Sequence, residues 1–443
     1  MFNTGAYTVM LSSCFSVAAL AVQPLAFDDL TTLIDGDTPS DSAAFDVDND
    51  GDPDFATSNR LSNDVVIFRN DGARVFVLTQ TIPLGAPGIE FKPRSIESAD
   101  FNHDGWLDLI TANELDGSLS LFLNDGAGTI LAPTQIPVGV KPTDLTITDV
   151  NDDGWLDVAV VQRGAGSQSV WVFVNNGADA NGWNGFSFDQ SYPIDPQGRA
   201  IIAVDINLDG FVDLITANRE AGTLSILPGT ATAAFMPRLT VSVGSLPRDL
   251  VAVDLDGDAR VDLAVIDFST GDVWALLNRG VANFQWLGLD PPTSIYQLGD
   301  GMHGVGSGDF DNDGIPDLAI ANLLESTGVT VLHNLGGFVF SSHVYPTTEC
   351  CTSSTVVADL DADGFEDIIT TSAQMAGQVQ ILWNTTSSLI PPQADLNGDD
   401  LVNGEDLALL LIAWGQSGVP ADLNNNGVVD GADLAGLLIS WSP

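Results

Sequence analysis

The sequence predicts an all-β protein, a seven-bladed β-propeller with cation-binding loops, followed by a small α-helical domain. Three observations support this prediction. A nine-residue aspartate motif occurs seven times, each copy is followed by the apolar runs and turns of further strands, and the pattern changes after Pro391-Pro392. Four strands in about 50 residues, repeated along the chain, are typical of propeller blades.

The composition agrees with a folded protein that holds metal ions. The 443 residues include 13 Lys and Arg against 60 Asp and Glu, which gives a formal net charge of −47, yet 44% of the residues are hydrophobic. This apolar content is sufficient for a core, so intrinsic disorder is excluded. The charge disfavours nucleic acid and anionic membranes as partners. Bound cations would explain the aspartates.

The first 21 residues have the properties of a secretory signal. Val9 to Val22 is apolar apart from three serines, is shorter than the ~20 residues of a membrane-spanning helix, and contains the small-x-small site Ala19-Leu20-Ala21. We therefore expect removal of residues 1–21, a secreted or cell-surface protein, and no transmembrane segment. A lipoprotein box ending at Cys14 is the alternative.

The repeated motif reads D-x-D/N-x-D-G-x-x-D, and its copies begin 49 to 56 residues apart. Oxygen ligands at positions 1, 3 and 5 point the same way, glycine at position 6 permits a sharp turn, and aspartate at position 9 closes a cage suited to Ca²⁺. Ala259 stands at position 6 of the fifth copy, so that site is expected to be weaker or distorted. The expected ligands are Asp46, Asp48, Asp50 and Asp54; Asp100, Asn102, Asp104 and Asp108; Asp149, Asn151, Asp153 and Asp157; Asp205, Asn207, Asp209 and Asp213; Asp254, Asp256, Asp258 and Asp262; Asp309, Asp311, Asp313 and Asp317; and Asp359, Asp361, Asp363 and Asp367.

Each motif lies between two apolar strands, and a third and a fourth strand follow, joined by turns such as Asn124-Asp125-Gly126. The seventh motif has no fourth strand before Pro391, whereas Phe27 to Ile34 is unpaired. We predict that this N-terminal segment completes the seventh blade. Residues 22–390 resemble the FG-GAP/VCBS repeats of integrin-alpha-like propellers. That resemblance implies adhesion to, or recognition of, an extracellular protein or carbohydrate.

After a linker at residues 391–393, residues 394–443 contain two longer acidic loops, each followed by a helical run. The expected ligands are Asp395, Asn397, Asp399, Asn403 and Asp406 in the first loop, and Asp422, Asn424, Asn426, Asp430 and Asp433 in the second. With one helix after each loop, this paired half-EF-hand arrangement resembles a type I dockerin. About nine Ca²⁺ sites would bring the formal charge to −29.

The dockerin resemblance implies association with a cohesin-like module. Gly404-Glu405 and Gly431-Ala432, however, replace the Ser/Thr pairs typical of dockerin recognition helices. A calcium-stabilised terminal module that serves sorting or stability is the alternative.

Basic residues concentrate on the face opposite the calcium loops, in the turns between second and third strands and in the connections between blades. We predict that they form the rim of a ligand site, with Arg60, Arg94, Arg199, Arg219 and Arg248 as binding residues. The alternative is that basic residues are merely excluded from the calcium loops.

The sequence contains no H-E-x-x-H, G-x-S-x-G, P-loop or dinucleotide motif. We therefore expect a monomeric protein that is not an enzyme and has no catalytic residues. A lectin-like or lyase-type protein that acts on polysaccharides remains the alternative. Trp183 and Trp286 are expected to be the tryptophans most available for stacking on sugars.

Overall fold

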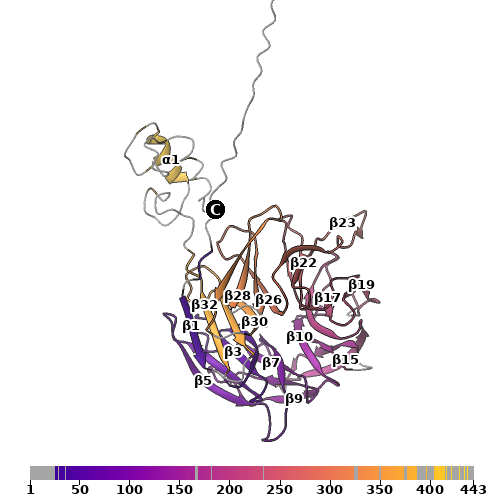
Figure 1. Cartoon of the computed structure of the whole chain (residues 1–443). Helices are drawn as coiled ribbons and strands as arrows, with labels where there is room; N and C mark the ends of the chain where they lie inside the picture. Colours follow the sequence, from indigo (N-terminus) through magenta and orange to yellow (C-terminus); the bar gives the residue numbers. More distant parts are fainter. Residues whose placement is uncertain are drawn as a thin grey trace, which may run out of the picture.

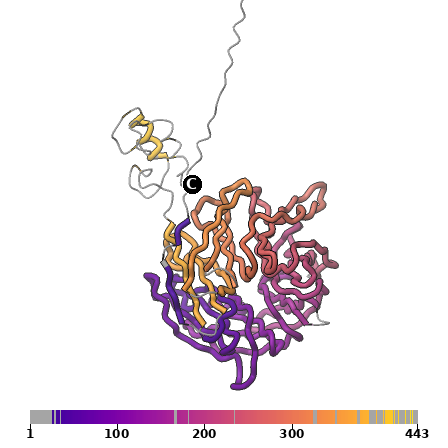
Figure 2. The backbone as a smooth tube through the Cα atoms, viewed as in Figure 1, coloured from indigo at the N-terminus to yellow at the C-terminus, as the bar shows by residue number. Residues whose placement is uncertain are grey.

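The computed structural model describes residues 25–386 apart from short gaps at residues 28, 35, 165–167, 181, 233, 324–327, 349–350 and 374–376. Beyond these it describes residues 404–414 and residues 396, 416, 421, 429, 434 and 437. Seven four-stranded antiparallel sheets are arranged around a central axis (Figures 1 and 2). The predicted all-β, seven-bladed propeller is confirmed.

The blades share one strand order, in which consecutive strands run from the axis to the rim. The first three blades are β2 (Pro39–Phe45), β3 (Asp54–Asn59), β4 (Asp64–Asn70) and β5 (Phe76–Pro83); β6 (Pro93–Ala99), β7 (Asp108–Asn113), β8 (Ser118–Phe122) and β9 (Thr134–Pro137); and β10 (Pro142–Thr148), β11 (Asp157–Gln162), β12 (Ser169–Asn175) and β15 (Phe186–Pro193). The third blade also carries the short hairpin β13 (Ala178–Asp179) and β14 (Gly182–Trp183).

The fourth to sixth blades are β16 (Gly198–Val204), β17 (Asp213–Asn218), β18 (Thr223–Leu227) and β19 (Leu239–Ser242); β20 (Pro247–Val253), β21 (Asp262–Asp267), β22 (Asp272–Leu276) and β25 (Thr293–Gln297); and β26 (Met302–Gly308), β27 (Asp317–Asn322), β28 (Gly328–Asn334) and β29 (Phe340–Pro346). The fifth blade carries the hairpin β23 (Val281–Ala282) and β24 (Gln285–Trp286).

The seventh blade is built from both ends of the propeller. Its strands are β30 (Thr352–Ala358), β31 (Asp367–Ser372), β32 (Gln378–Trp383) and, from the N-terminal side, β1 (Asp29–Ile34). The β1–β32 pair runs from Asp29 opposite Trp383 to Ile34 opposite Gln378. The Trp383 Nε1–H donates to the Thr31 hydroxyl at 2.8 Å. The predicted closure by the N-terminal strand is therefore confirmed, and it covers an edge that would otherwise be exposed.

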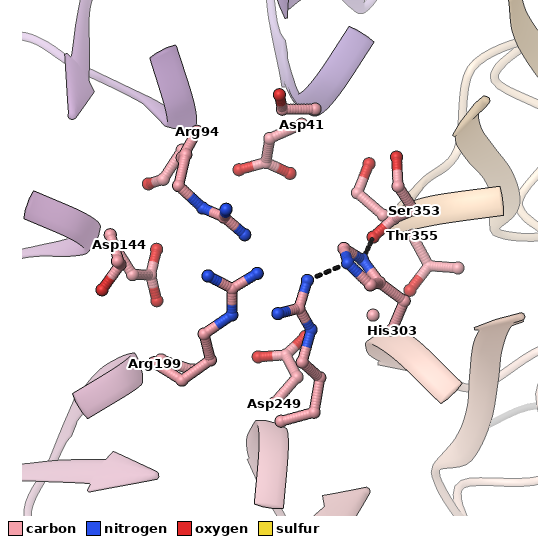
Figure 3. Close-up of a pocket in the computed structure, with 15 residues that line it drawn as sticks. Asp41, Arg94, Asp144, Arg199, Asp249, His303, Ser353 and Thr355 are labelled. Atoms are coloured by element: carbon pink, nitrogen blue, oxygen red, sulfur yellow. Dashed lines mark hydrogen bonds between the residues drawn. The ribbon is translucent and has the colours of Figure 1, made fainter. Parts of the chain in front are cut away.

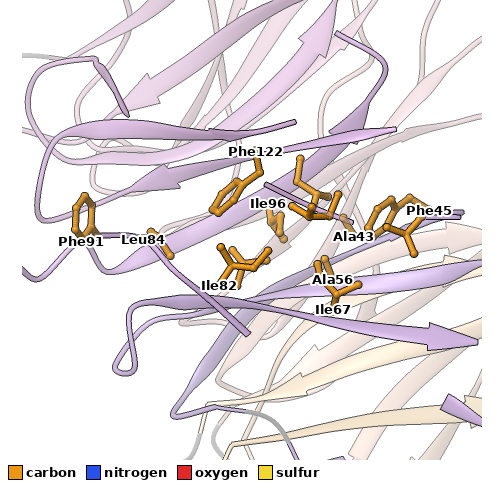
Figure 4. Packing of buried hydrophobic residues seen from close by; sticks show 13 residues of the cluster. Ala43, Phe45, Ala56, Ile67, Ile82, Leu84, Phe91, Ile96 and Phe122 are labelled. Carbon is orange, nitrogen blue, oxygen red and sulfur yellow. The ribbon is translucent and has the colours of Figure 1, made fainter. Parts of the chain in front are cut away.

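Apolar side chains fill the space between neighbouring blades. The second strand of each blade is buried along its whole length, which agrees with the apolar run after each motif. Between the first two blades, Phe45 and Ile67 lie in one cluster with Ile96 and Phe122 (Figure 4). Similar clusters between other blades join the sheets, so each blade is stabilised mainly by its neighbours.

The described part of the C-terminal region contains one helix, α1 (Gly404–Ile412). It begins three residues before the predicted apolar run at Leu407. Leu410 is buried in a cluster with Ala421, Val429 and Leu437. Within the described residues, no helix has the length and apolar character needed to cross a membrane.

Candidate functional site

The seven aspartate loops share one hydrogen-bond pattern. In each, the position-1 carboxylate accepts from the backbone N–H of position 6 at 2.7–3.0 Å. The position-5 carboxylate accepts from the N–H of position 7 at 2.8–3.0 Å. The fifth loop keeps this pattern, because Ala259 adopts a left-handed φ of 65° and its N–H reaches Asp254 at 2.7 Å. The backbone of the fifth loop is therefore like that of the others, and a weaker cation site there stays a prediction.

The aspartate at position 9 is fully buried in every loop. One carboxylate oxygen accepts from the N–H of position 2 at 2.7–3.2 Å. The other accepts from the N–H at the end of the third strand at 2.7–2.8 Å. Burial, partly opposed by these hydrogen bonds, raises the pKa to about 7 for Asp54, Asp108, Asp213, Asp317 and Asp367, and to about 6 for Asp157 and Asp262. Without a cation, these carboxylates resist ionisation.

Several loops bring metal-ligating atoms together. Ligand atoms lie within 4.8 Å of one another in three all-carboxylate groups, which are Asp46, Asp48 and Asp50; Asp254, Asp256 and Asp262; and Asp359, Asp361 and Asp367. Such oxygen-rich sets fit a hard cation such as Ca²⁺. Two position-3 carboxylates also face arginine, because Arg69 approaches Asp48 at 3.4 Å and Arg74 approaches Asp361 at 2.6 Å.

The sixth loop includes a histidine that the sequence did not single out. His333 Nε2 lies 2.9 Å from the Asp311 carboxylate, and Asp313 completes the group. Burial alone would lower the pKa of His333, but Asp311 and Asp317 raise it. This loop therefore has a different ligand set from the others.

An asparagine at the end of the third strand joins neighbouring blades. Its side-chain N–H donates to a carbonyl in the loop of the preceding blade at 2.7–3.0 Å: Asn70 to Leu360, Asn124 to Val47, Asn175 to Phe101, Asn278 to Ile206, Asn334 to Leu255, and Asn384 to Phe310. One of these asparagines, Asn124, begins the turn that the sequence predicts between a third and a fourth strand. Their link to another blade was missed, although their recurrence 16 or more residues after position 9 is a detectable signal.

Trp183 and Trp286, the tryptophans expected to be most available for stacking on sugars, form hydrogen bonds with two of the asparagines that join neighbouring blades. Trp183 donates to Asn175 at 2.7 Å, and Trp286 donates to Asn278 at 2.9 Å. Both rings are half-buried and pack on the apolar clusters. These contacts stabilise the blades, and stacking of the two rings on sugars stays a prediction.

A polar pocket lies on the axis, and it is lined by the innermost strands (Figure 3). Each innermost strand has a register shift at its second residue. A bulge of this kind re-aims a side chain. All seven second residues line the pocket, and they are Ser40, Arg94, Thr143, Arg199, Arg248, His303 and Ser353. We call this set the bulge ring.

Three of the five predicted binding arginines meet in the bulge ring. Figure 3 shows Arg94 and Arg199 directed toward the centre, and Arg248 lines the same pocket. Arg199 and Arg248 are only 7% and 6% exposed. The Nη1 atom of Arg199 is buried without a hydrogen-bond partner in the described structure. The predicted basic rim is therefore, in part, a buried basic pocket.

His303 holds Arg248 in place. Its Nδ1 lies 2.6 Å from the Ser353 carbonyl, and its Nε2 contacts the Arg248 guanidinium. Burial, with repulsion from Arg94, lowers the pKa of His303 to about 4. The imidazole is thus neutral at pH 7, so Nδ1–H donates to Ser353 and Nε2 accepts from Arg248. Arg248 consequently gains a partner that does not neutralise its charge.

The remaining two predicted residues, Arg60 and Arg219, do not line this pocket. Arg60 and Arg94 both contact the Glu114 carboxylate, at 3.0 and 3.2 Å. Arg60 also lines a wider cavity of about 210 Å³ that shares Arg94, Arg199 and His303 with the pocket. Arg219 instead lies over the Phe268 ring, 5.0 Å from its centroid.

Three aspartates line the same pocket, close to the bulge ring. Asp41, Asp144 and Asp249 each accept from a backbone N–H of the next blade, at 3.2, 2.9 and 3.0 Å. Burial raises the pKa of Asp144 to about 7 and that of Asp249 to about 6. These carboxylates connect blades, and within the described residues no ion pair joins them to the bulge-ring arginines.

Comparison with known families identifies the repeats. The model of the FG-GAP-like repeat matches residues 46–111, 100–160, 149–216, 205–265, 254–320 and 309–370. The chain belongs to the FG-GAP-like repeat family. Each family match begins at the first aspartate of a loop and extends into the next blade, so the FG-GAP-like unit spans the boundary between two blades.

Solved structures share this FG-GAP-like propeller's fold at low sequence identity. BBS1N in complex with ARL6DN, in a mercury-soaked crystal, has a TM-score of 0.56 and 12% identity, and the match covers 82% of this chain and 98% of that chain. The lead-soaked form has a TM-score of 0.54 and 14% identity, and the match covers 80% of this chain and 95% of that chain. Sqt1 of Saccharomyces cerevisiae has a TM-score of 0.52 and 11% identity, and the match covers 80% of this chain and 98% of that chain. No curated protein sequence matches significantly.

The predicted ligands of the C-terminal domain mostly lie outside the described residues, as do residues 1–21. The exception is Asp406, which is fully buried and accepts from the Leu396 N–H at 2.8 Å.

Proposed function

We propose that this protein is a secreted, calcium-stabilised recognition module that binds an extracellular protein or carbohydrate through the arginine-bearing face of its propeller. The observation that carries this proposal is the convergence of Arg94, Arg199 and Arg248 in one pocket. Burying three cations is costly unless they meet negative partners. A structure that needed only stability would be better served by apolar residues there.

Calcium is proposed for the aspartate loops because their carboxylates converge and the buried position-9 groups resist ionisation without a cation. Asp213 illustrates the point, since burial raises its pKa to about 7. A divalent cation would restore the ionised form. In this role the metal stiffens each loop and takes no part in a reaction.

Recognition of a partner has a parallel in the same fold. BBS1N was solved in complex with ARL6DN, so a propeller of this architecture binds a protein there. For the present chain we propose a protein or carbohydrate ligand, and a non-enzymatic role. We further propose that residues 394–443 form a calcium-binding, dockerin-like tail for anchoring or cohesin-type association. The small apolar cluster around Leu410 supports a folded unit there.

A glycan array and a pull-down from extracellular material, both with calcium-loaded protein, test this proposal. We expect saturable binding that survives deletion of residues 391–443 and is lost when Arg94, Arg199 and Arg248 are replaced by Ala. Ligands bound equally by the variant would contradict the assignment of the site. Release of new unsaturated chain ends from an acidic polysaccharide would instead identify a lyase.

A further inference from the structure

The bulge ring contains cationic donors that the protein leaves without an anion. Arg94 forms an ion pair with Glu114 at 3.2 Å, a carboxylate that also pairs with Arg60 and Arg163. Arg199 and Arg248 form no ion pair with a carboxylate among the described residues, although both are more than nine-tenths buried. Arg248 instead contacts the neutral His303, and Nη1 of Arg199 has no hydrogen-bond partner.

A buried guanidinium N–H without an acceptor carries a free-energy cost, because its lost hydration is not replaced. Asp41, Asp144 and Asp249 line the same pocket, but none of them forms an ion pair with Arg199 or Arg248 within the described residues, so they do not remove this cost. The cost is recovered when a ligand supplies oxygen acceptors. Guanidinium groups bind carboxylate and sulfate through paired hydrogen bonds.

We propose that the bulge ring binds one oxyanionic group, a carboxylate or a sulfate, between the guanidinium groups of Arg199 and Arg248. This inference rests on the proposed recognition function and names the chemical group that the ligand presents. The hydroxyls of Ser40, Thr143 and Ser353 line the same pocket and supply further donors.

The dimensions limit what enters. The pocket has a volume of about 110 Å³, which suits a single charged group, and it shares five lining residues with the cavity of about 210 Å³ beside Arg60. The charged group thus reaches the axis while the rest of the ligand lies in the wider cavity. A free anion and the acid group of a terminal sugar both meet this requirement.

Isothermal titration calorimetry of the full chain in calcium, with sulfate, D-glucuronate and D-glucose, tests the proposal. We expect saturable, mutually competitive binding of sulfate and glucuronate, and none of glucose. Tighter binding of glucuronate would identify an acidic sugar as the source, and tighter binding of sulfate a free anion. Absence of binding by both anions would overturn the proposal.

Arg199→Gln should weaken anion binding at least about tenfold, because it removes a charge-assisted hydrogen bond. Arg279→Gln is the matched control, since this half-exposed arginine pairs with Asp290 at 3.6 Å and the substitution makes the same charge change. Equal weakening by both variants, or by neither, would overturn the site.

Anion binding here together with a negative glycan array and pull-down would separate this inference from the recognition function.

Discussion

At the scale of single residues, the asparagines at the end of the third strands do more than form turns, because their side chains also join neighbouring blades. The side-chain amide of Asn278 donates to Ile206 of the preceding blade at 2.7 Å and to Val261 of its own loop at 3.1 Å. The side-chain oxygen of Asn278 accepts from the Trp286 indole N–H at 2.9 Å. The fourth blade lacks this contact, because Gly229 stands at the equivalent place and a Cβ there would lie 2.3 Å from the Val212 carbonyl.

Asn278→Ala is expected to destabilise the protein by about 2–4 kcal/mol, since it leaves two buried carbonyls without donors. Urea unfolding in calcium measures the change. Asn184→Ala is the matched control, because this side chain is exposed. A free energy of unfolding that changes equally in both variants would show that the blade-to-blade hydrogen bonds contribute nothing.

The buried position-9 aspartates predict the pH dependence of the metal-free protein. Their folded pKa values of about 6–7 lie above the unfolded value of 3.8. Unfolding of such groups releases protons, so stability is greatest below pH 4 and is lost as the pH rises through 6–7.

In a chelator, we therefore expect the melting temperature to fall between pH 5 and pH 8. Differential scanning calorimetry measures this fall. The same titration in excess calcium should show a smaller dependence, because the cation stabilises the ionised carboxylates. A metal-free melting temperature that rises over this range would refute the assignment of these groups.

At the scale of elements, the strand that closes the ring is short but has many partners. The Phe27 ring, just before β1, lies 5.4 Å from Phe310 and 4.9 Å from Tyr345. The Ala26 carbonyl accepts from the Thr385 N–H at 2.7 Å beyond the end of the strand pair. Apolar packing and backbone hydrogen bonds thus act together at this junction.

Deletion of residues 22–34 should lower the melting temperature and broaden the transition, because β32 becomes an exposed edge. Deletion of residues 391–443 is the control, since it removes no strand from the seven sheets. Calorimetry that records the same sharp transition after both deletions would contradict the role of β1.

Most of the elements could be predicted from the sequence, because each blade repeats the same loop and apolar run. The bulge ring was predicted only in part. Its members stand six residues before the first aspartate of each loop, so a signal existed. Their meeting at the axis depends on a register shift, such as that between Pro247 and Asp249, that no local residue preference specifies. The role of Asn278 was missed because its acceptor belongs to another blade.

At the scale of the whole molecule, charge opposes the fold unless cations are bound. The net charge is −47, and 25 of the 60 acidic residues are aspartates at positions 1, 3, 5 and 9 of the seven loops. Mutual repulsion of these groups destabilises the compact state. Ions that bind only the folded protein would reverse this effect.

Removal of divalent metal with EDTA at pH 7.5 should lower the melting temperature steeply. Each site filled at a hundredfold excess over its Kd adds about 2.7 kcal/mol. Calcium should restore the original value, whereas the same ionic strength of sodium chloride should not. A melting temperature unchanged by EDTA would exclude a stabilising metal.

The join at β1 and β32 also sets the order of events during synthesis. Thr31 and Trp383, which are hydrogen-bonded in the finished sheet, are 352 residues apart. At a translation rate of about 5–20 residues per second, β1 waits roughly 20–70 s for its partner strand to be made. A nascent or prematurely terminated chain therefore cannot complete the circle. Only a chain translated through β32 can protect its strand edges, so closure itself distinguishes finished propellers from incomplete ones.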